Sequence, residues 1–326
     1  MKKVTLNQIR SGTYGFCTGD ALGVPVEFRT RSELQAHPLT EMRSGGTHGQ
    51  PAGTWSDDSS MALCLMASLG EKEAVDYQDI MDRFADWYYH GAYTPFGDCF
   101  DCGNTCGRAI NNYRHGTPAA ECGETSNRSN GNGSLMRILP LAYPLYDNFG
   151  RDLTSNNSAM RLIHTVSGLT HRHPIAQSSC GIYLCIAVNL LDGFGKEAAI
   201  RDGIASALAW YRDQPDFADH IHVWNRLKSV KEFQDLPEDE IGSSGYCVDT
   251  LEAALWCLLN TDNYSACVLK AVNLGSDTDT TATVAGGLAG LIYGFEGIPS
   301  PWINALQKPD LIEECCTNLA KADIRL

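Results

Sequence analysis

Two short acidic segments stand far apart in this chain, Ser56-Asp57-Asp58-Ser59 and Asp277-Thr278-Asp279-Thr280. Each follows a glycine-bearing turn and precedes a run of apolar and small residues typical of a buried helix. If the fold brings them together, four carboxylates will repel one another strongly unless divalent cations that prefer oxygen ligands neutralise them. The two segments therefore predict one site for a pair of metal ions, and a two-metal hydrolase is the first hypothesis. Carboxylates and hydroxyls suit Mg²⁺ or Mn²⁺ better than Zn²⁺.

Helix capping is the alternative interpretation of both segments. Serine and aspartate are good N-cap residues, and acidic side chains in a first turn interact favourably with the helix dipole. Taken alone, residues 56–59 fit capping better than metal binding. The alternation Asp-x-Asp-Thr in the second segment places two carboxylates and a hydroxyl around one point, and two such segments in one chain favour a metal site.

Two further polar stretches precede expected helices. In the glycine-rich stretch 127–137, backbone N–H groups could form an anion-binding nest before a helix that begins near Leu135, although a plain turn fits equally well. Arg137 could bind a phosphate or pair with a neighbouring acid. His171 and His173 stand directly before Pro174, where a hydrogen-bonded cap is a more common role for histidine than metal ligation.

Cys99, Cys102 and Cys106 follow the i, i+3, i+7 spacing of one helix face. Small thiols on such a face usually pack as apolar residues, which we favour over a metal–thiolate site. On this helix Asp101 and Asn104, three residues apart, would share a different face and point into a cavity.

Helices must position these residues, because alternating β-branched runs are scarce and small-residue helical runs recur. The prediction is an all-α fold that forms a single domain over residues 1–326. A close-packed helix over 7–22 should end at Gly23, before Pro25. Buried helices are expected at 59–69, 175–191 and 280–293, outer amphipathic helices at 77–90, 198–212 and 250–259, and a short helix at 223–227 within the polar connection 213–245.

Composition narrows the class of protein. With 326 residues, 43% of them hydrophobic, the chain can bury a large core. A net charge of −14 argues against a nucleic-acid partner or an anionic membrane surface. The longest apolar run, roughly 282–295, is shorter than the ~18 residues of a membrane span. Thirteen cysteines placed largely in helical runs, with no signal peptide before them, predict a reduced cytoplasmic protein.

Together these motifs resemble the ADP-ribosylglycohydrolase family, which includes the bacterial enzyme that removes ADP-ribose from dinitrogenase reductase. The resemblance runs nearly the whole chain, with several motifs in the family's order. They are Gly19-Asp20-Ala21-Leu22-Gly23 with Glu27, Trp55-Ser56-Asp57-Asp58-Ser59, Phe100-Asp101-Cys102-Gly103-Asn104-Thr105, Gly131-Asn132-Gly133-Ser134-Leu135-Met136-Arg137, Thr170-His171, Gly245-Tyr246 with 249–256, and Gly275-Ser276-Asp277-Thr278-Asp279-Thr280.

The resemblance implies an orthogonal multi-helix bundle with a dinuclear Mg²⁺ or Mn²⁺ cleft. Its implied metal ligands are Ser56, Asp57, Asp58, Asp277, Asp279 and Thr280. The chain departs from the family at Ser56, where threonine is usual, at Cys102 and Cys106, where isoleucine and threonine are common, and at Ser276, where glycine is common. Ser56 keeps the ligating hydroxyl, whereas the two cysteines change the packing near Asp101.

The resemblance also implies the chemistry. The substrate would be a protein carrying ADP-ribose, with the ribose hydroxyls on the metal pair and cleavage of an N-glycosidic bond through an oxocarbenium-like state. Glu27 and Asp101 would stabilise the developing charge, and pairing of Asp101 with a guanidinium leaving group favours ADP-ribosyl-arginine. The remaining substrate contacts would come from Asn104, Gly131, Asn132, Gly133, Ser134 and Met136, with His171 and Tyr246 at the adenosine end.

Three other functions stay open at this point. The chain could act as an immunity protein that occludes an ADP-ribosyltransferase toxin by contact. It could release ADP-ribose from another linkage, such as serine. It could also be a two-metal phosphohydrolase that cuts the pyrophosphate and releases AMP.

Overall fold

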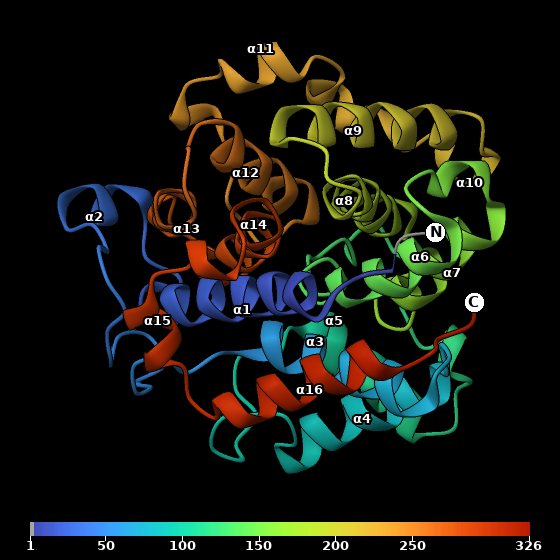
Figure 1. Cartoon of the computed structure of the whole chain (residues 1–326), viewed down its shortest axis with the longest axis horizontal. Helices are drawn as coiled ribbons and strands as arrows, with labels where there is room; N and C mark the ends of the chain where they lie inside the picture. Colours follow the sequence, from blue (N-terminus) through green and yellow to red (C-terminus); the bar gives the residue numbers. More distant parts are fainter. Residues whose placement is uncertain (1–2) are drawn as a thin grey trace.

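The computed structural model describes residues 3–326, which fold into an assembly of helices (Figure 1). The all-α prediction is confirmed, since within this range the only β pairings are three isolated bridges, Gly45 with Gln50, Glu124 with His171 and Gly131 with Tyr246. The helices are α1 Leu6–Gly23, α2 Arg31–Ala36, α3 Asp57–Lys72, α4 Tyr77–His90, α5 Asn104–Arg114, α6 Ala142–Phe149, α7 Asn157–Gly168, α8 Pro174–Leu191, α9 Lys196–Arg212, α10 Pro215–Ala218, α11 Val230–Gln234, α12 Cys247–Leu259, α13 Tyr264–Asn273, α14 Thr278–Tyr293, α15 Ser300–Ala305 and α16 Pro309–Lys321.

Short 3₁₀ helices link several of these elements. They are η1 Val24–Val26, η2 Ala119–Glu121, η3 Leu139–Leu141, η4 Leu153–Ser155, η5 Ile221–Lys228, η6 Glu238–Glu240 and η7 Phe295–Gly297. The helix expected within 223–227 is part of η5.

Helices α1 and α14 cross at the centre of the molecule with their backbones in close approach. A Cβ atom on Gly19 would lie 2.1 Å from the carbonyl oxygen of Ala282, and one on Gly23 would lie 2.2 Å from the Cα atom of Asp279. Only glycine permits such an approach. The crossing fixes the first turn of α14, which carries Asp279, against the end of α1.

The other helices pack on either side of this crossing. Figure 1 shows α3, α4 and α16 on one side of α1, and α8, α9, α12 and α13 on the side of α14. Helix α3 is buried from Asp57 to Leu69, as its apolar sequence predicts. Helix α4 is amphipathic, with one buried face, and is capped by Asp76 and by Gly91 in a left-handed conformation.

Helix α12 differs from its predicted outer position. Ten residues of its predicted segment, Thr250 to Leu259, are buried. The polar connection before it supplies the covering layer, because Gln234 donates a hydrogen bond to the Leu259 carbonyl and Trp256 donates one to the Leu236 carbonyl. The apolar residues of the helix therefore face protein on both sides.

The helix expected near Leu135 does not form, and residues 133–137 make turns instead. Proline explains the difference. Pro140 lacks the N–H that an α-helix through this position would use, so a 3₁₀ turn forms there and α6 starts only at Ala142, with Pro144 in its first turn. The glycine-rich turn consequently has no α-helix N-terminus behind it.

The shared helix face predicted for the cysteines is also wrong. Helix α5 begins at Asn104, so Cys99, Cys102 and Asp101 precede it and only Cys106 is helical. Asp101 has φ +58°, a left-handed conformation that interrupts any helix. All thirteen cysteines, each within the described range, are free thiols.

Helix α8 is long and apolar enough, by length and composition, to cross a membrane. The prediction that the longest apolar run lies at 282–295 and is too short for a membrane span overlooked this helix. Its most apolar 18-residue window is 89% buried within the protein. Burial of this extent is typical of a core helix, so the fold is compatible with a soluble protein. Its N-cap is His173, whose ring accepts a hydrogen bond from the Ile175 N–H, as predicted.

Candidate metal centre and substrate cleft

The N-termini of α3 and α14 meet, and they bring the two acidic segments together. Ser56 is the N-cap of α3, and both its hydroxyl and that of Thr280 donate hydrogen bonds to Oδ2 of Asp58, at 3.2 and 3.3 Å. Asp277 occupies the N-cap position of α14 but makes no side-chain capping bond. Capping therefore accounts for Ser56, whereas Oδ1 of Asp277 has no hydrogen-bond partner.

Several carboxylate oxygens at this junction are buried and have no hydrogen-bond partner. They are Oδ1 of Asp58, Oδ1 of Asp277 and Oδ2 of Asp279. Asp58 and Asp279 are each 1% exposed. An unpaired buried carboxylate oxygen is costly in free energy, and oxygen-ligated divalent cations remove this cost. The donor set at the junction therefore fits a divalent metal centre.

Asp20 of α1 holds the start of α3 in place. Its carboxylate accepts hydrogen bonds from the backbone N–H of Ser56 at 2.9 Å, from the N–H of Ser59 at 3.0 Å and from the Ser59 hydroxyl at 2.6 Å. Asp20 itself is fully buried. The α1–α14 crossing and Asp20 together tie both acidic helix ends to the same part of α1.

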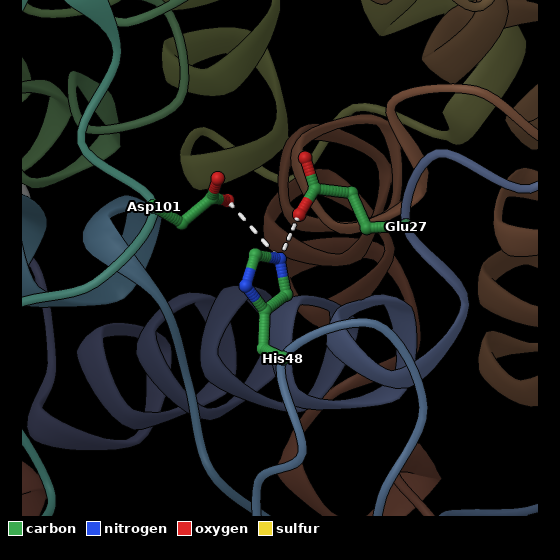
Figure 2. A group of neighbouring side chains, drawn as sticks. All are labelled: Glu27, His48 and Asp101. Carbon is green, nitrogen blue, oxygen red and sulfur yellow. Dashed lines mark hydrogen bonds and ion pairs between the residues drawn. The ribbon is translucent and has the colours of Figure 1, made fainter.

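Glu27 follows η1 and stands between two groups of possible ligands. One of its carboxylate oxygens lies within 4.8 Å of carboxylate oxygens of both Asp277 and Asp279. On its other side it contacts His48, whose Nε2 lies 2.5 Å from Oε2 of Glu27 and 4.0 Å from Oδ2 of Asp101 (Figure 2). Glu27, His48 and Asp101 thus extend the acidic cluster toward the protein surface.

Burial dominates the electrostatics of these carboxyls. It raises the pKa values of Asp57, Asp58 and Asp279 well above the usual range, and the charges of neighbouring acids raise them further. Burial likewise raises the pKa of Glu27 to about 8, and burial together with the charge of Glu27 raises that of Asp101 to about 8. The cluster is consequently suited to binding positive charge.

A cleft of about 260 Å³ opens beside the cluster. Most of the predicted site residues line it: Glu27, Asp57, Asp101, Asn104, Gly131, Asn132, Gly133, Met136, His171, Asp277 and Thr280. Ser56, Asp58 and Asp279 lie behind this lining. Ser134 is buried and hydrogen-bonds with Ser167 and Cys180, so its side chain does not reach the cleft. Tyr246 is not among the lining residues, whereas Gly245 is.

The glycine-rich turn is joined to the start of α12 and to the acidic cluster. The N–H of Asn132 donates to the Gly245 carbonyl at 3.0 Å, and the N–H of Cys247 donates to the Asn130 carbonyl at 3.0 Å. The Asn132 amide also donates to Oδ2 of Asp277 at 2.8 Å. One wall of the cleft is thereby fixed relative to the second acidic segment.

His171 packs behind this turn. A Cβ atom on Gly133 would lie 2.9 Å from Cε1 of His171 and 2.7 Å from Sγ of Cys106, so any larger residue would displace these side chains. Burial lowers the pKa of His171 to about 3, and the ring is therefore neutral at physiological pH.

A larger hollow of about 640 Å³ lies between α4 and α5, with Asp82, Tyr89 and Arg114 in its lining. None of the residues that line it belongs to either acidic segment. We place the functional site in the smaller cleft, because Asp57 and Asp277, one from each acidic segment, both line it.

Residue types and spacing alone assign no role to Asp20, His48 or Phe28. Asp20 stands within the glycine-rich end of α1, and its hydrogen bonds to α3 depend on tertiary packing. His48 lies in the loop between α2 and α3, where no periodicity marks it. A lone carboxylate inside an apolar helix is the one signal that could have pointed to Asp20.

This chain is similar over most of its length to proteins of a known family. The family model described as ADP-ribosylglycohydrolase matches residues 1–325. An ADP-ribosylarginine hydrolase, Tri1, of Serratia proteamaculans is 32% identical over 97% of this chain and 79% of its own length. The ADP-ribosyl-[dinitrogen reductase] glycohydrolase of Rhodospirillum rubrum is 32% identical over 90% of this chain and 87% of its own.

A solved structure described as an ADP-ribosylglycohydrolase-related protein complex is also similar. It superimposes with a TM-score of 0.77 at 28% identity and covers 98% of both chains. The match extends over almost the full sequence and includes the helices that carry the acidic junction. The chain therefore belongs to the ADP-ribosylglycohydrolase family.

Proposed function

We propose that this protein is a metal-dependent hydrolase that removes ADP-ribose from modified arginine side chains of proteins. The observation that carries the proposal is the convergence of the α3 and α14 N-termini, with unpartnered buried carboxylates, on a cleft that Glu27 and Asp101 also line. Relatives named ADP-ribosylarginine hydrolase, 32% identical over nearly the whole chain, support arginine as the acceptor.

The residues that would hold the metal are Ser56, Asp57, Asp58, Asp277, Asp279 and Thr280, and we propose two Mg²⁺ or Mn²⁺ ions. When bound, such ions orient the ribose hydroxyls and lower the pKa of a coordinated water. Glu27 lies close enough to Asp277 and Asp279 to contribute a further oxygen.

Glu27 and Asp101 are the proposed catalytic carboxylates. Both line the cleft, and His48 links them. As the glycosidic bond breaks, positive charge develops on the ribose, and a nearby carboxylate stabilises it. Asp101 would accept charge-assisted hydrogen bonds from the guanidinium leaving group. Raised pKa values of about 8 mean that arrival of positive charge would favour ionisation of both carboxyls.

The opposite wall of the cleft would hold the rest of ADP-ribose. Gly131, Asn132 and Gly133 line the cleft, and Asn104, Met136 and neutral His171 complete this side. We propose pyrophosphate binding at the glycine-rich turn, which lines the cleft and has no helix N-terminus behind it. The adenosine end would lie toward His171 and the segment that contains Tyr246.

The test is the product and its dependence on acceptor and metal. Peptides carrying arginine-linked or serine-linked ADP-ribose are incubated with the protein in MgCl₂, in MnCl₂ or in EDTA, and products are separated by chromatography. We expect free ADP-ribose from the arginine peptide only when metal is present. Release from the serine peptide alone would overturn the acceptor assignment, and AMP as product would show a phosphohydrolase.

The occlusion of a transferase toxin is tested with the double variant Asp57→Ala, Asp279→Ala. Protection of a target from an ADP-ribosyltransferase should disappear together with hydrolysis if the enzyme acts catalytically. Protection that survives would favour occlusion by contact. We further propose that the chain works as one domain in the reducing cytoplasm, which its thirteen free thiols support.

A further inference from the structure

Phe28 is an aromatic residue held open to solvent at the mouth of the cleft. Three large hydrophobic residues are exposed within residues 3–326, namely Phe28 at 66%, Phe96 at 52% and Tyr89 at 41%. Of these three, Phe28 alone lines the cleft. A single exposed apolar side chain is ordinary on a protein surface, but the place of this ring in the cleft lining makes it available to a bound substrate.

The backbone of Phe28 is fixed in an unfavourable conformation. Its φ is +64°, in the left-handed region that phenylalanine rarely adopts. Two hydrogen bonds hold it there: the Phe28 N–H donates to the Ser276 carbonyl at 2.7 Å, and the Ser276 N–H donates to the Arg29 carbonyl at 2.7 Å. Ser276 is itself left-handed, with φ +66°. The ring is therefore positioned by the segment that leads directly into Asp277.

The surroundings of the ring combine aromatic and acidic groups. Phe28 follows Glu27, and its ring centroid lies 6.1 Å from that of His48, which is in turn 5.2 Å from the ring of Phe100. Asp101 and Glu27 both approach Nε2 of His48 (Figure 2). A planar guanidinium pairs with carboxylates through its edge and stacks on aromatic rings through its face. Carboxylates and an open ring at one cleft mouth present both kinds of partner.

We propose that Phe28 stacks on the acceptor arginine of the substrate and thereby contributes to selection of arginine as the ADP-ribosylated side chain. This inference rests on the proposed function and adds to it a specificity residue on the acceptor side of the cleft. Asp101 and Glu27 would contact the guanidinium nitrogens, while Phe28 covers its face.

The experiment measures kcat/KM for ADP-ribosyl-agmatine and for an arginine-modified peptide in the Mg²⁺-loaded protein. Phe28→Ala and Phe28→Leu should each lower kcat/KM by roughly 3- to 30-fold, the range of one cation–π contact. Phe28→Tyr should stay within about twofold of wild type, because it keeps the ring. Phe96→Ala removes a similarly exposed ring outside the cleft lining and serves as the matched control.

The variant Phe28→Gly distinguishes a folding defect from the loss of the contact between the ring and the substrate. Glycine adopts a positive φ freely, so this variant should melt no lower than wild type while it loses activity as Phe28→Ala does. Inhibition by free ADP-ribose is measured in parallel and should not change in any variant, because ADP-ribose lacks the acceptor.

Two results would overturn the inference while leaving the proposed function intact. One is wild-type kcat/KM in Phe28→Ala or in Phe28→Leu. The other is an equal weakening of ADP-ribose inhibition, which would place the ring against ADP-ribose itself. Failure of the wild-type protein to release ADP-ribose from either arginine substrate would instead refute the proposed function, and this inference with it.

Discussion

Substitution of Asp58 by asparagine should separate the stability of the metal-free protein from its function. Asp58 is 1% exposed, its Oδ1 has no partner, and burial raises its pKa well above the usual range. Its Oδ2 accepts hydrogen bonds from the hydroxyls of Ser56 and Thr280. The amide oxygen in D58N can accept the same two bonds, so the substitution removes the charge and preserves most of the local contacts.

The magnitude follows from the cost of the buried carboxyl. Each unit by which burial raises the pKa of a carboxyl above its unfolded value of ~3.9 costs about 1.4 kcal/mol of stability at neutral pH. Relaxation and the retained hydrogen bonds reduce this, and we expect D58N to stabilise the metal-free protein by about 2 kcal/mol. With an unfolding entropy of ~2.1 cal/mol/K per residue over 326 residues, this corresponds to about 3 °C in Tm.

The assay is thermal unfolding in EDTA and in MgCl₂ between pH 6 and pH 8. Because the folded pKa is raised, the unfolded chain loses the Asp58 proton first as pH rises above ~4, and the metal-free wild type loses stability relative to D58N. Mg²⁺ at 100 times its Kd should add ~2.7 kcal/mol to the wild type. D58N should lack most of that gain and should lose hydrolase activity.

Glu252→Gln is the matched control. Glu252 is also buried, at 4% exposed, and its Oε1 has no partner. Burial raises its pKa to about 7. Unlike Asp58, it pairs with Arg226 and belongs to neither acidic segment. Its substitution should leave the Mg²⁺-induced gain intact. A lower metal-free Tm in D58N, or an equal Mg²⁺ gain in D58N and wild type, would refute the reasoning.

Three further changes test other parts of the fold. Asp20→Ala should cost about 3 kcal/mol in urea unfolding and weaken Mg²⁺ binding, because it leaves buried donors such as the Ser59 N–H without an acceptor. Burial lowers the pKa of His164 to about 3, so the unfolded chain binds a proton at this residue more readily than the folded one. The free energy of unfolding should therefore fall by up to ~1.4 kcal/mol per pH unit as pH drops below ~6.5. His164→Gln should flatten this pH dependence in urea unfolding, and an unchanged slope would mean that other groups cause it. Gly23→Ala would place a Cβ 2.2 Å from Cα of Asp279 and should destabilise by about 3 kcal/mol, measured by urea unfolding; wild-type stability would show that α1 and α14 can separate.

Local sequence signals predicted most of the helical framework. The end of α1 at Gly23 and the N-cap of α8 at His173 follow from glycine, proline and polar residues at helix boundaries. The acidic segments could be paired from the sequence, because carboxylates of this density require a counter-charge. These signals are carried by residues that are neighbours in the chain.

Other features depend on tertiary packing and left no local trace. Whether α12 is an outer or an inner helix depends on the connection that covers it, and no residue of α12 records that covering. His48 reaches Glu27 because its loop folds back over η1, where the Thr47 hydroxyl donates to the Glu27 carbonyl at 2.6 Å. The absence of a helix near Leu135 has a local cause, because Pro140 prevents an α-helix that the apolar pattern alone would favour.

Capping and metal binding, which the sequence presents as alternatives, are combined at this junction. Ser56 caps α3, and two helix N-termini each contribute roughly half a positive charge to the acidic cluster. That amount of positive charge is too small for Asp57, Asp58, Asp277 and Asp279 together, and three of their oxygens remain unpaired. A fold selected only for stability would replace these carboxylates with apolar residues. These buried carboxylates lower the stability of the metal-free fold, and a bound ligand of opposite charge explains why they are present. The cleft beside them would bring a substrate to that ligand.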